Sequence, residues 1–104
     1  INMSINKKSL NTLEKICGEK LTLSSLILSI RKGEEITQVS FAKKLGVSRQ
    51  YLCDIEHNRR SVSPKMAEKF AKILGYSQEQ FVRLCLQDLM AKEGIDMIVN
   101  VTAA

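Results

Sequence analysis

The sequence predicts an all-α fold: one small domain of five helices, preceded by a short extra helix and followed by a single β-strand. Three observations support this prediction. The chain has 104 residues, of which 44% are hydrophobic and only one is proline. Apolar residues recur at intervals of three and four, the period of a helix with one buried face. Serine or threonine precedes these stretches and glycine follows most of them, as at helix ends. A chain this short leaves no room for an enzyme cleft between lobes, so we expect no catalytic activity.

The helical domain is expected to span residues 21–92, after an N-terminal extension of residues 1–20. Within the extension, apolar spacing predicts a short helix over residues 9–17. Thr22 is expected to cap the first helix of the domain, which ends near Gly33. The buried stripe of this helix consists of Leu23, Leu26, Ile27 and Ile30.

Residues 38–57, QVSFAKKLGVSRQYLCDIEH, predict two short helices crossed at a tight turn. Ala42 is small enough for another helix to approach closely. Gly46 ends the first of the two helices, because glycine tolerates the left-handed conformation common at helix C-termini, and Ser48 caps the second. The core-facing residues of the pair are Phe41, Leu45, Val47, Leu52 and Ile55.

The last two helices of the domain begin at hydroxyl caps. Ser63 followed by Pro64 is a typical helix start, and Gly75 marks the end of that helix. Ser77 is expected to cap the final helix. The buried residues of the two helices are Met66, Ala67, Phe70, Ala71, Ile73, Leu74, Phe81, Leu84, Cys85 and Leu89.

The helix after Ser48 has a polar face opposite its buried one. At about 100° per residue, five side chains fall within about 140° of one another: Arg49, Gln50, Cys53, Asp54 and His57. Arginine, glutamine and aspartate can pair with guanine, adenine and cytosine edges in a major groove that admits a helix. Sixteen Lys and Arg against eleven Asp and Glu give a net charge of +5 and a pI near 9.3, which favours a polyanionic partner.

This segment resembles the helix-turn-helix of the Cro and phage-repressor (XRE) family. It matches the family's small residue at Ala42, its glycine at Gly46, and its five core-facing positions. The resemblance implies a lambda-repressor-like domain that binds double-stranded DNA. The residues expected to contact bases are Arg49, Gln50, Cys53 and Asp54. For Cys53, contact with a thymine methyl and oxidation sensing are alternatives to the favoured interpretation, a small residue that lets the helix enter the groove.

Phosphate contacts are expected to flank this helix, because the DNA backbone fixes register while base edges give specificity. Gln38 begins the preceding helix, and the resembled family uses a glutamine there to contact phosphate. Asn58 stands where the family often has glycine, and asparagine also tolerates a positive φ. The expected phosphate contacts are Gln38, Ser48, Asn58, Arg59, Arg60, Ser61 and Lys43, with Lys44 and Lys65 as weaker candidates.

Arg31 and Glu56 are expected to form a structural salt bridge. Glu56 lies on the packing side of its helix, where an unpaired carboxylate would cost several kcal/mol. The resembled family pairs an arginine and a glutamate at these two positions. The alternative is that Arg31 contacts phosphate.

The three cysteines, Cys17, Cys53 and Cys85, are widely spaced and have only His57 as a possible nitrogen partner. This pattern favours neither a metal site nor any cofactor. The longest apolar stretch is half the length of a membrane span, and no signal peptide is evident, so we expect a cytoplasmic, nucleoid-associated protein.

The C-terminal segment, residues 93–104, departs from the helical period. Its apolar residues alternate with polar ones, which predicts a strand, and an isolated strand could pair with its copy in a second subunit. We therefore expect a homodimer; a disordered or simply packed tail is the alternative. The residues expected at this dimer contact are Ile95, Met97, Val99 and Val101.

Together these features predict a dimeric, sequence-specific transcriptional repressor that reads a palindromic operator through the major groove. One alternative is an antitoxin that represses its own operon and also binds a toxin protein, since many antitoxins resemble this family. A second is a protein-interaction bundle without DNA binding. Acidic or bulky apolar residues at positions 49, 50 and 59 would favour that bundle. The sequence instead has Arg49, Gln50 and Arg59 there.

Overall fold

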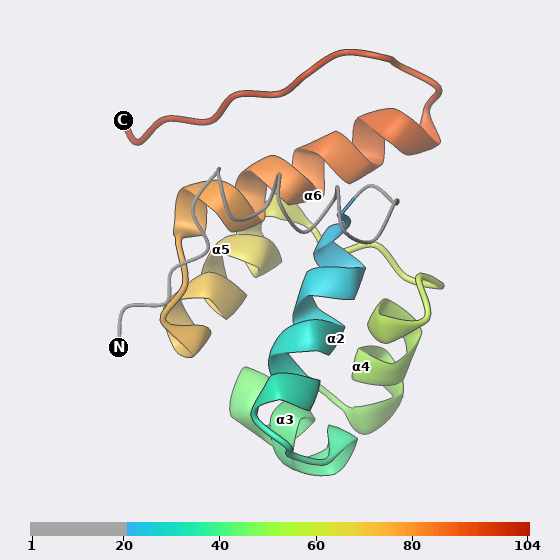
Figure 1. The fold of residues 1–104 in the computed structure, drawn as a ribbon, viewed down its shortest axis with the longest axis vertical. Helices are drawn as coiled ribbons and strands as arrows, with labels where there is room; N and C mark the ends of the chain where they lie inside the picture. Colours follow the sequence, from blue (N-terminus) through green and yellow to red (C-terminus); the bar gives the residue numbers. More distant parts are fainter. Residues whose placement is uncertain (1–20) are drawn as a thin grey trace.

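A computed structural model describes residues 21–104, and five helices form within this range (Figure 1). They are α2 (Leu23–Gly33), α3 (Gln38–Leu45), α4 (Arg49–Glu56), α5 (Pro64–Leu74) and α6 (Gln78–Lys92). The five helices predicted for the domain are confirmed. The extra helix predicted over residues 9–17, together with Cys17, lies outside the described residues. Between residues 21 and 104, no helix is long and apolar enough to cross a membrane.

Each helix begins at a hydroxyl residue whose side chain accepts a hydrogen bond from the backbone N–H three residues later. These bonds are 3.0–3.2 Å long. A cap of this kind typically contributes about 1 kcal/mol. The capping residues are Thr22, Thr37, Ser48, Ser63 and Ser77. The sequence therefore sets the helix starts locally, before tertiary packing acts on them.

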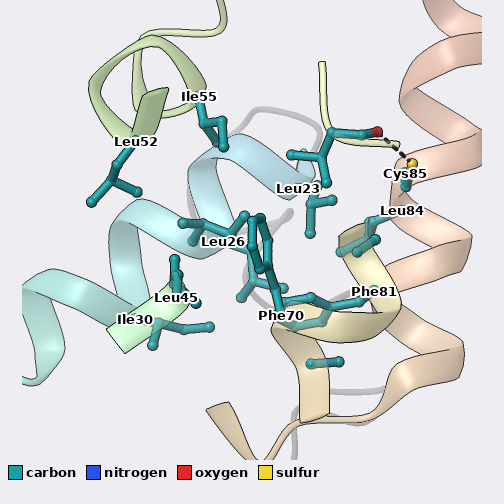
Figure 2. Packing of buried hydrophobic residues seen from close by; sticks show 14 of the residues in the cluster. Leu23, Leu26, Ile30, Leu45, Leu52, Ile55, Phe70, Phe81, Leu84 and Cys85 are labelled. Atoms are coloured by element: carbon teal, nitrogen blue, oxygen red, sulfur yellow. Dashed lines mark hydrogen bonds between the residues drawn. The ribbon is translucent and has the colours of Figure 1, made fainter. Parts of the chain in front are cut away.

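The core lies where all five helices meet (Figure 2). The largest fully buried side chains among the described residues are three phenylalanines, Phe41 from α3, Phe70 from α5 and Phe81 from α6. Cys85 packs as a small apolar residue, and its thiol donates a 2.9 Å hydrogen bond to the carbonyl of Val62. Burial and the neighbouring carboxylate of Asp88 raise the pKa of this thiol to about 11.

The predicted C-terminal strand is wrong: residues 95–104 form no strand. After α6 the chain reverses at Gly94, whose φ of 74° is left-handed, and runs back along α6 (Figure 1). The side chain of Gln87, in α6, holds it there: Nε2 donates to the carbonyl of Met97 at 2.7 Å, and Oε1 accepts from the N–H of Val99 at 2.9 Å. A side-chain amide carries the same donor and acceptor as a peptide group, so Gln87 supplies bonds that the prediction assigned to a second strand.

The four residues predicted at the dimer contact differ in exposure. Val99 and Val101 are half-buried, whereas Ile95 is 43% exposed and Met97 66%. The neighbouring Ile98 is 85% exposed. The tail therefore presents an apolar surface, but as an extended segment that follows its own chain.

Candidate nucleic-acid interface

The α3–α4 pair has the crossed geometry predicted from the sequence. Gly46 adopts a φ of 76°, and the N–H of Val47 then reaches back to the carbonyl of Ala42 at 3.0 Å, closing the end of α3. Ser48 starts α4 two residues later by accepting a bond from the N–H of Tyr51. The apolar faces of both helices are buried through Phe41, Ala42, Leu45, Leu52 and Ile55. The opposite face of α4 is consequently turned outward.

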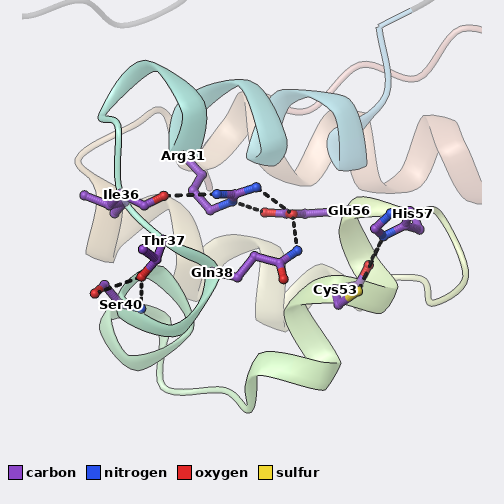
Figure 3. Close-up of polar contacts among 8 residues, drawn as sticks. All are labelled: Arg31, Ile36, Thr37, Gln38, Ser40, Cys53, Glu56 and His57. Carbon is purple, nitrogen blue, oxygen red and sulfur yellow. Dashed lines mark hydrogen bonds and ion pairs between the residues drawn. The ribbon is translucent and has the colours of Figure 1, made fainter.

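A buried ion pair fixes the end of α4 to α2. Arg31 donates to the Glu56 carboxylate through Nε at 2.6 Å and Nη2 at 3.2 Å, and its Nη1 donates to the carbonyl of Ile36 at 3.0 Å (Figure 3). The side chain of Glu56 is only 2% exposed. The pair expected between Arg31 and Glu56 is thus present, and it joins the two helices through their least exposed charges.

Gln38 takes part in the same network. Its Nε2 donates to Oε1 of Glu56 at 2.8 Å, so the first residue of α3 is bonded to the last residue of α4 (Figure 3). Gln38 was expected to contact phosphate, and its side-chain nitrogen instead faces inward in this structure. A contact between residues 18 apart has no local sequence signal that could have revealed it.

The four expected base-contacting residues share one side of α4, which we call the reading face: Arg49, Gln50, Cys53 and Asp54. Arg49 and Gln50 are exposed, whereas Cys53 and Asp54 are half-buried. Gln50 donates to Oδ1 of Asp54 at 3.0 Å. The expected residues are therefore brought together, with an amide and a carboxylate already bonded to each other.

Arg59 joins the reading face from beyond the helix. Asn58 adopts a φ of 57°, and the N–H of Arg59 bonds to the carbonyl of Asp54 at 2.7 Å while that of Asn58 bonds to Ile55 at 3.0 Å. This pair of bonds is the Schellman arrangement, which folds the chain back over the helix end. The Arg59 guanidinium consequently contacts Asp54 through Nε and Nη2, both at 3.1 Å, and Nη2 donates to Sγ of Cys53 at 3.5 Å.

Asp54 and Arg59 stabilise each other's charged forms. Partial desolvation raises the pKa of Asp54. Hydrogen bonds from Arg59 and Gln50, together with the charges of Arg59 and Arg60, outweigh this effect, so the pKa of Asp54 is lowered overall. The bond to Asp54 likewise raises the pKa of Arg59. Both groups are therefore ionised at neutral pH.

Arg60 takes a different direction. Its guanidinium carbon lies 4.7 Å from the centre of the Tyr51 ring, within the range of a cation–π contact. Tyr51 was not among the expected site residues, because a partner nine residues away leaves no periodic signal. The two consecutive arginines thus have separate partners, Asp54 and Tyr51.

The other expected phosphate contacts lie around this face. Lys43 and Asn58 are exposed. The hydroxyl of Ser48 is engaged as the cap of α4, and that of Ser61 accepts a bond from Nζ of Lys92 at 2.5 Å. Lys44 is 3.5 Å from Glu34. Lys43, Arg60 and the exposed Lys65 of α5 are therefore the cations of this set that are not paired with a carboxylate among the described residues.

Cys53 and His57 lie one helical turn apart on the same side of α4. Sγ of Cys53 is 3.5 Å from Nδ1 of His57, which also lies 2.8 Å from the Cys53 carbonyl oxygen (Figure 3). Within residues 21–104, no group of three or more potential metal ligands is found. Two ligands alone do not complete a tetrahedral site.

Comparison with known proteins identifies relatives of this segment. Residues 27–81 match a family model described as "Helix-turn-helix". Over 55 residues the chain is 42% identical to the "Immunity repressor protein" of Bacillus phage phi105, a match that covers 53% of this chain and 38% of the phage protein. The chain therefore aligns with well under half the length of that relative. No solved structure matches the chain.

Proposed function

Since the chain belongs to the helix-turn-helix family of the Cro and phage-repressor type, we propose that it is a repressor that binds an operator sequence specifically as a dimer. Residues 21–92 form the DNA-binding domain in this proposal, and residues 93–104 contribute to the contact between subunits. α4 enters the major groove, and two copies of it occupy successive grooves of a palindromic site.

The exposed face of α4 carries the proposal. Its polar side chains, Arg49 and Gln50 foremost, are uncovered by the rest of the described chain, while the other face of the helix is buried and its end is tied down through Glu56. The backbone of a helix held this firmly has little freedom left to lose on binding, which favours specific recognition. Lys43 and Arg60 lie beside it with charge available for phosphate.

The length of α4 supports a dimer. Eight residues extend about 12 Å, which corresponds to roughly three or four base pairs at 3.4 Å each. One copy therefore reads too short a sequence to select an operator from a genome, whereas two copies double the contacts. The exposed apolar residues of the tail, Ile95, Met97 and Ile98, form the surface that we assign to the second subunit. In Figure 1 the tail lies at the opposite end of the molecule from α3, so a partner bound there leaves α4 accessible.

Selection of binding sites from a random DNA library tests the specificity. We expect the protein to enrich a two-fold symmetric consensus, and Arg49→Ala or Gln50→Ala to lose preference at particular base pairs at a cost of about 1–3 kcal/mol. Arg60→Ala should weaken binding to all sequences and reduce the slope of log K against log salt by about 0.9. Recovery of no consensus by the unaltered protein would refute the proposal.

Sedimentation tests the assembly. Met97→Asp and Ile98→Asp should each convert a dimer into a monomer, because a carboxylate would be buried in the contact. Val39→Asp is the matched control, since Val39 is 58% exposed on α3, away from the tail. A dimer that survives both tail substitutions would exclude the tail as the subunit contact.

The antitoxin alternative draws on the same apolar tail, which would fit a toxin protein as well as a second copy. Co-expression with the product of the adjacent reading frame distinguishes the two. A stable complex that Ile98→Asp abolishes, formed by a chain that is monomeric alone, would favour the antitoxin.

A further inference from the structure

We propose that Arg59 is a base-contacting residue that recognises a guanine in each half-site, and that Asp54 is a positioning residue that aims it. The inference rests on the proposed binding of α4 in the major groove. Sequence spacing alone groups Arg59 with the phosphate contacts, since it follows the end of the helix.

The backbone at the end of α4 brings Arg59 back to the reading face. The left-handed Asn58 and the bond from the Arg59 N–H to the Asp54 carbonyl direct the chain over the last turn of the helix. The side chain then lies against Asp54 and Cys53, two residues that face the same way as Arg49 and Gln50. An arginine directed at the flanking backbone would instead extend away from these residues.

The orientation of the guanidinium leaves a binding edge available. Oδ1 of Asp54 takes the side of the guanidinium that bears Nε and one N–H of Nη2, both at 3.1 Å. The other contact of Nη2 is long, 3.5 Å to the sulfur of Cys53, which is a weak acceptor. Within residues 21–104, Nη1 has no acceptor. The edge formed by Nη1 and Nη2 can therefore present two parallel N–H groups, the arrangement that matches O6 and N7 of guanine.

Asp54 is better suited to orient Arg59 than to contact a base. Its Oδ1 already accepts from Gln50 at 3.0 Å and from Nε of Arg59 at 3.1 Å. A bare carboxylate beside DNA would also be repelled by phosphates, and the contact with Arg59 offsets its charge. Because Arg59 is held before binding, less side-chain entropy is lost when it docks on the base.

Arg60 provides the matched comparison. It is the next residue, carries the same charge and is also exposed, but it stacks on Tyr51. If position near the groove alone decided the role, the two arginines would behave alike. The structure predicts that substitution of Arg59 changes which sequence is preferred, whereas substitution of Arg60 changes only how tightly any sequence is held.

The test measures binding to the selected operator and to a copy in which one guanine of each half-site is replaced by 7-deazaguanine, which lacks the N7 acceptor but pairs normally. Unaltered protein should bind the modified operator more weakly by about 5- to 150-fold. Arg59→Ala should lose this discrimination and broaden the selected consensus at that position. Arg60→Ala should retain the discrimination while binding both operators more weakly.

Asp54 variants test the positioning role. Asp54→Ala should reduce the 7-deazaguanine discrimination, and Asp54→Asn, which keeps an oxygen acceptor for Nε, should restore part of it. Equal loss of affinity by Arg59→Ala for operator and unrelated DNA, with an unchanged consensus, would show a phosphate contact and overturn the proposal. Unchanged binding would show that the pair only closes the helix end, and would overturn it too. If the unaltered protein selected no consensus, the repressor proposal itself would fail.

Discussion

Replacement of Glu56 by alanine should destabilise the domain by about 3 kcal/mol. Its carboxylate is 2% exposed and receives bonds from Arg31 at 2.6 and 3.2 Å and from Gln38 at 2.8 Å. Removing one partner of a buried ion pair typically costs 3–5 kcal/mol, chiefly because the remaining charge is left without compensation. The side chain of Arg31 is 16% exposed and keeps its hydrogen bond to the carbonyl of Ile36, so water can solvate part of the guanidinium. The expected cost is therefore at the lower end of this range.

A loss of this size is large for the molecule. At about 0.05–0.15 kcal/mol per residue, the 84 described residues, 21–104, correspond to roughly 4–13 kcal/mol of total stability. Urea unfolding followed by circular dichroism should show the reduced midpoint, and the melting temperature should fall by about 12–24 °C.

Two further variants serve as controls for the effect of Glu56→Ala on stability. Lys44→Ala breaks an ion pair of 3.5 Å whose side chains are 44% and 39% exposed, and should change stability by less than about 0.5 kcal/mol. Arg31→Met combined with Glu56→Leu should cost less than Glu56→Ala, because no unpaired charge remains. If Glu56→Ala were as mild as Lys44→Ala, the ion pair would not be what anchors α4.

Three other measurements follow from the structure. Gln87→Ala removes two hydrogen bonds to the tail, so it should lower the free energy of unfolding by about 1–2 kcal/mol and raise the hydrogen-exchange rate of the Val99 amide. If that amide exchanged as slowly as before, other contacts would hold the tail. In a Cys17→Ser variant, Cys53 should react with a disulfide reagent in the folded protein while Cys85, 2% exposed, reacts only on unfolding. In the folded protein the pKa of the Cys85 thiol is raised from 9.0 to about 11, so this thiol ionises at lower pH in the unfolded chain than in the folded one. The free energy of unfolding should therefore fall as pH rises from 9.0 to about 11. The Cys85→Ala variant should show a smaller fall over the same pH range.

Much of the fold could be predicted because its determinants are local. A hydroxyl residue such as Ser48 caps a helix through its own next turn, and Gly46 ends one through its own φ. The pairing of Arg31 with Glu56 was accessible only through the family resemblance, since the residues are 25 positions apart. The tail shows the limit: alternation along residues 95–101 predicts a strand, but the partner of that backbone is a side chain on another element, Gln87, and no strand forms there.

The direction of Arg59 shows why a functional site is harder to predict than the fold that carries it. Helical periodicity assigns faces only to residues inside a helix, and Arg59 lies three positions beyond the end of α4. Its direction depends on one backbone angle, the φ of 57° at Asn58, and on a carboxylate one turn back that can receive its guanidinium. A glycine at position 58 would preserve this geometry because it adopts positive φ without strain, whereas a β-branched residue would oppose it. Asn58→Val should therefore weaken the guanine preference even though residue 58 itself contacts no base, and Asn58→Gly should leave that preference intact.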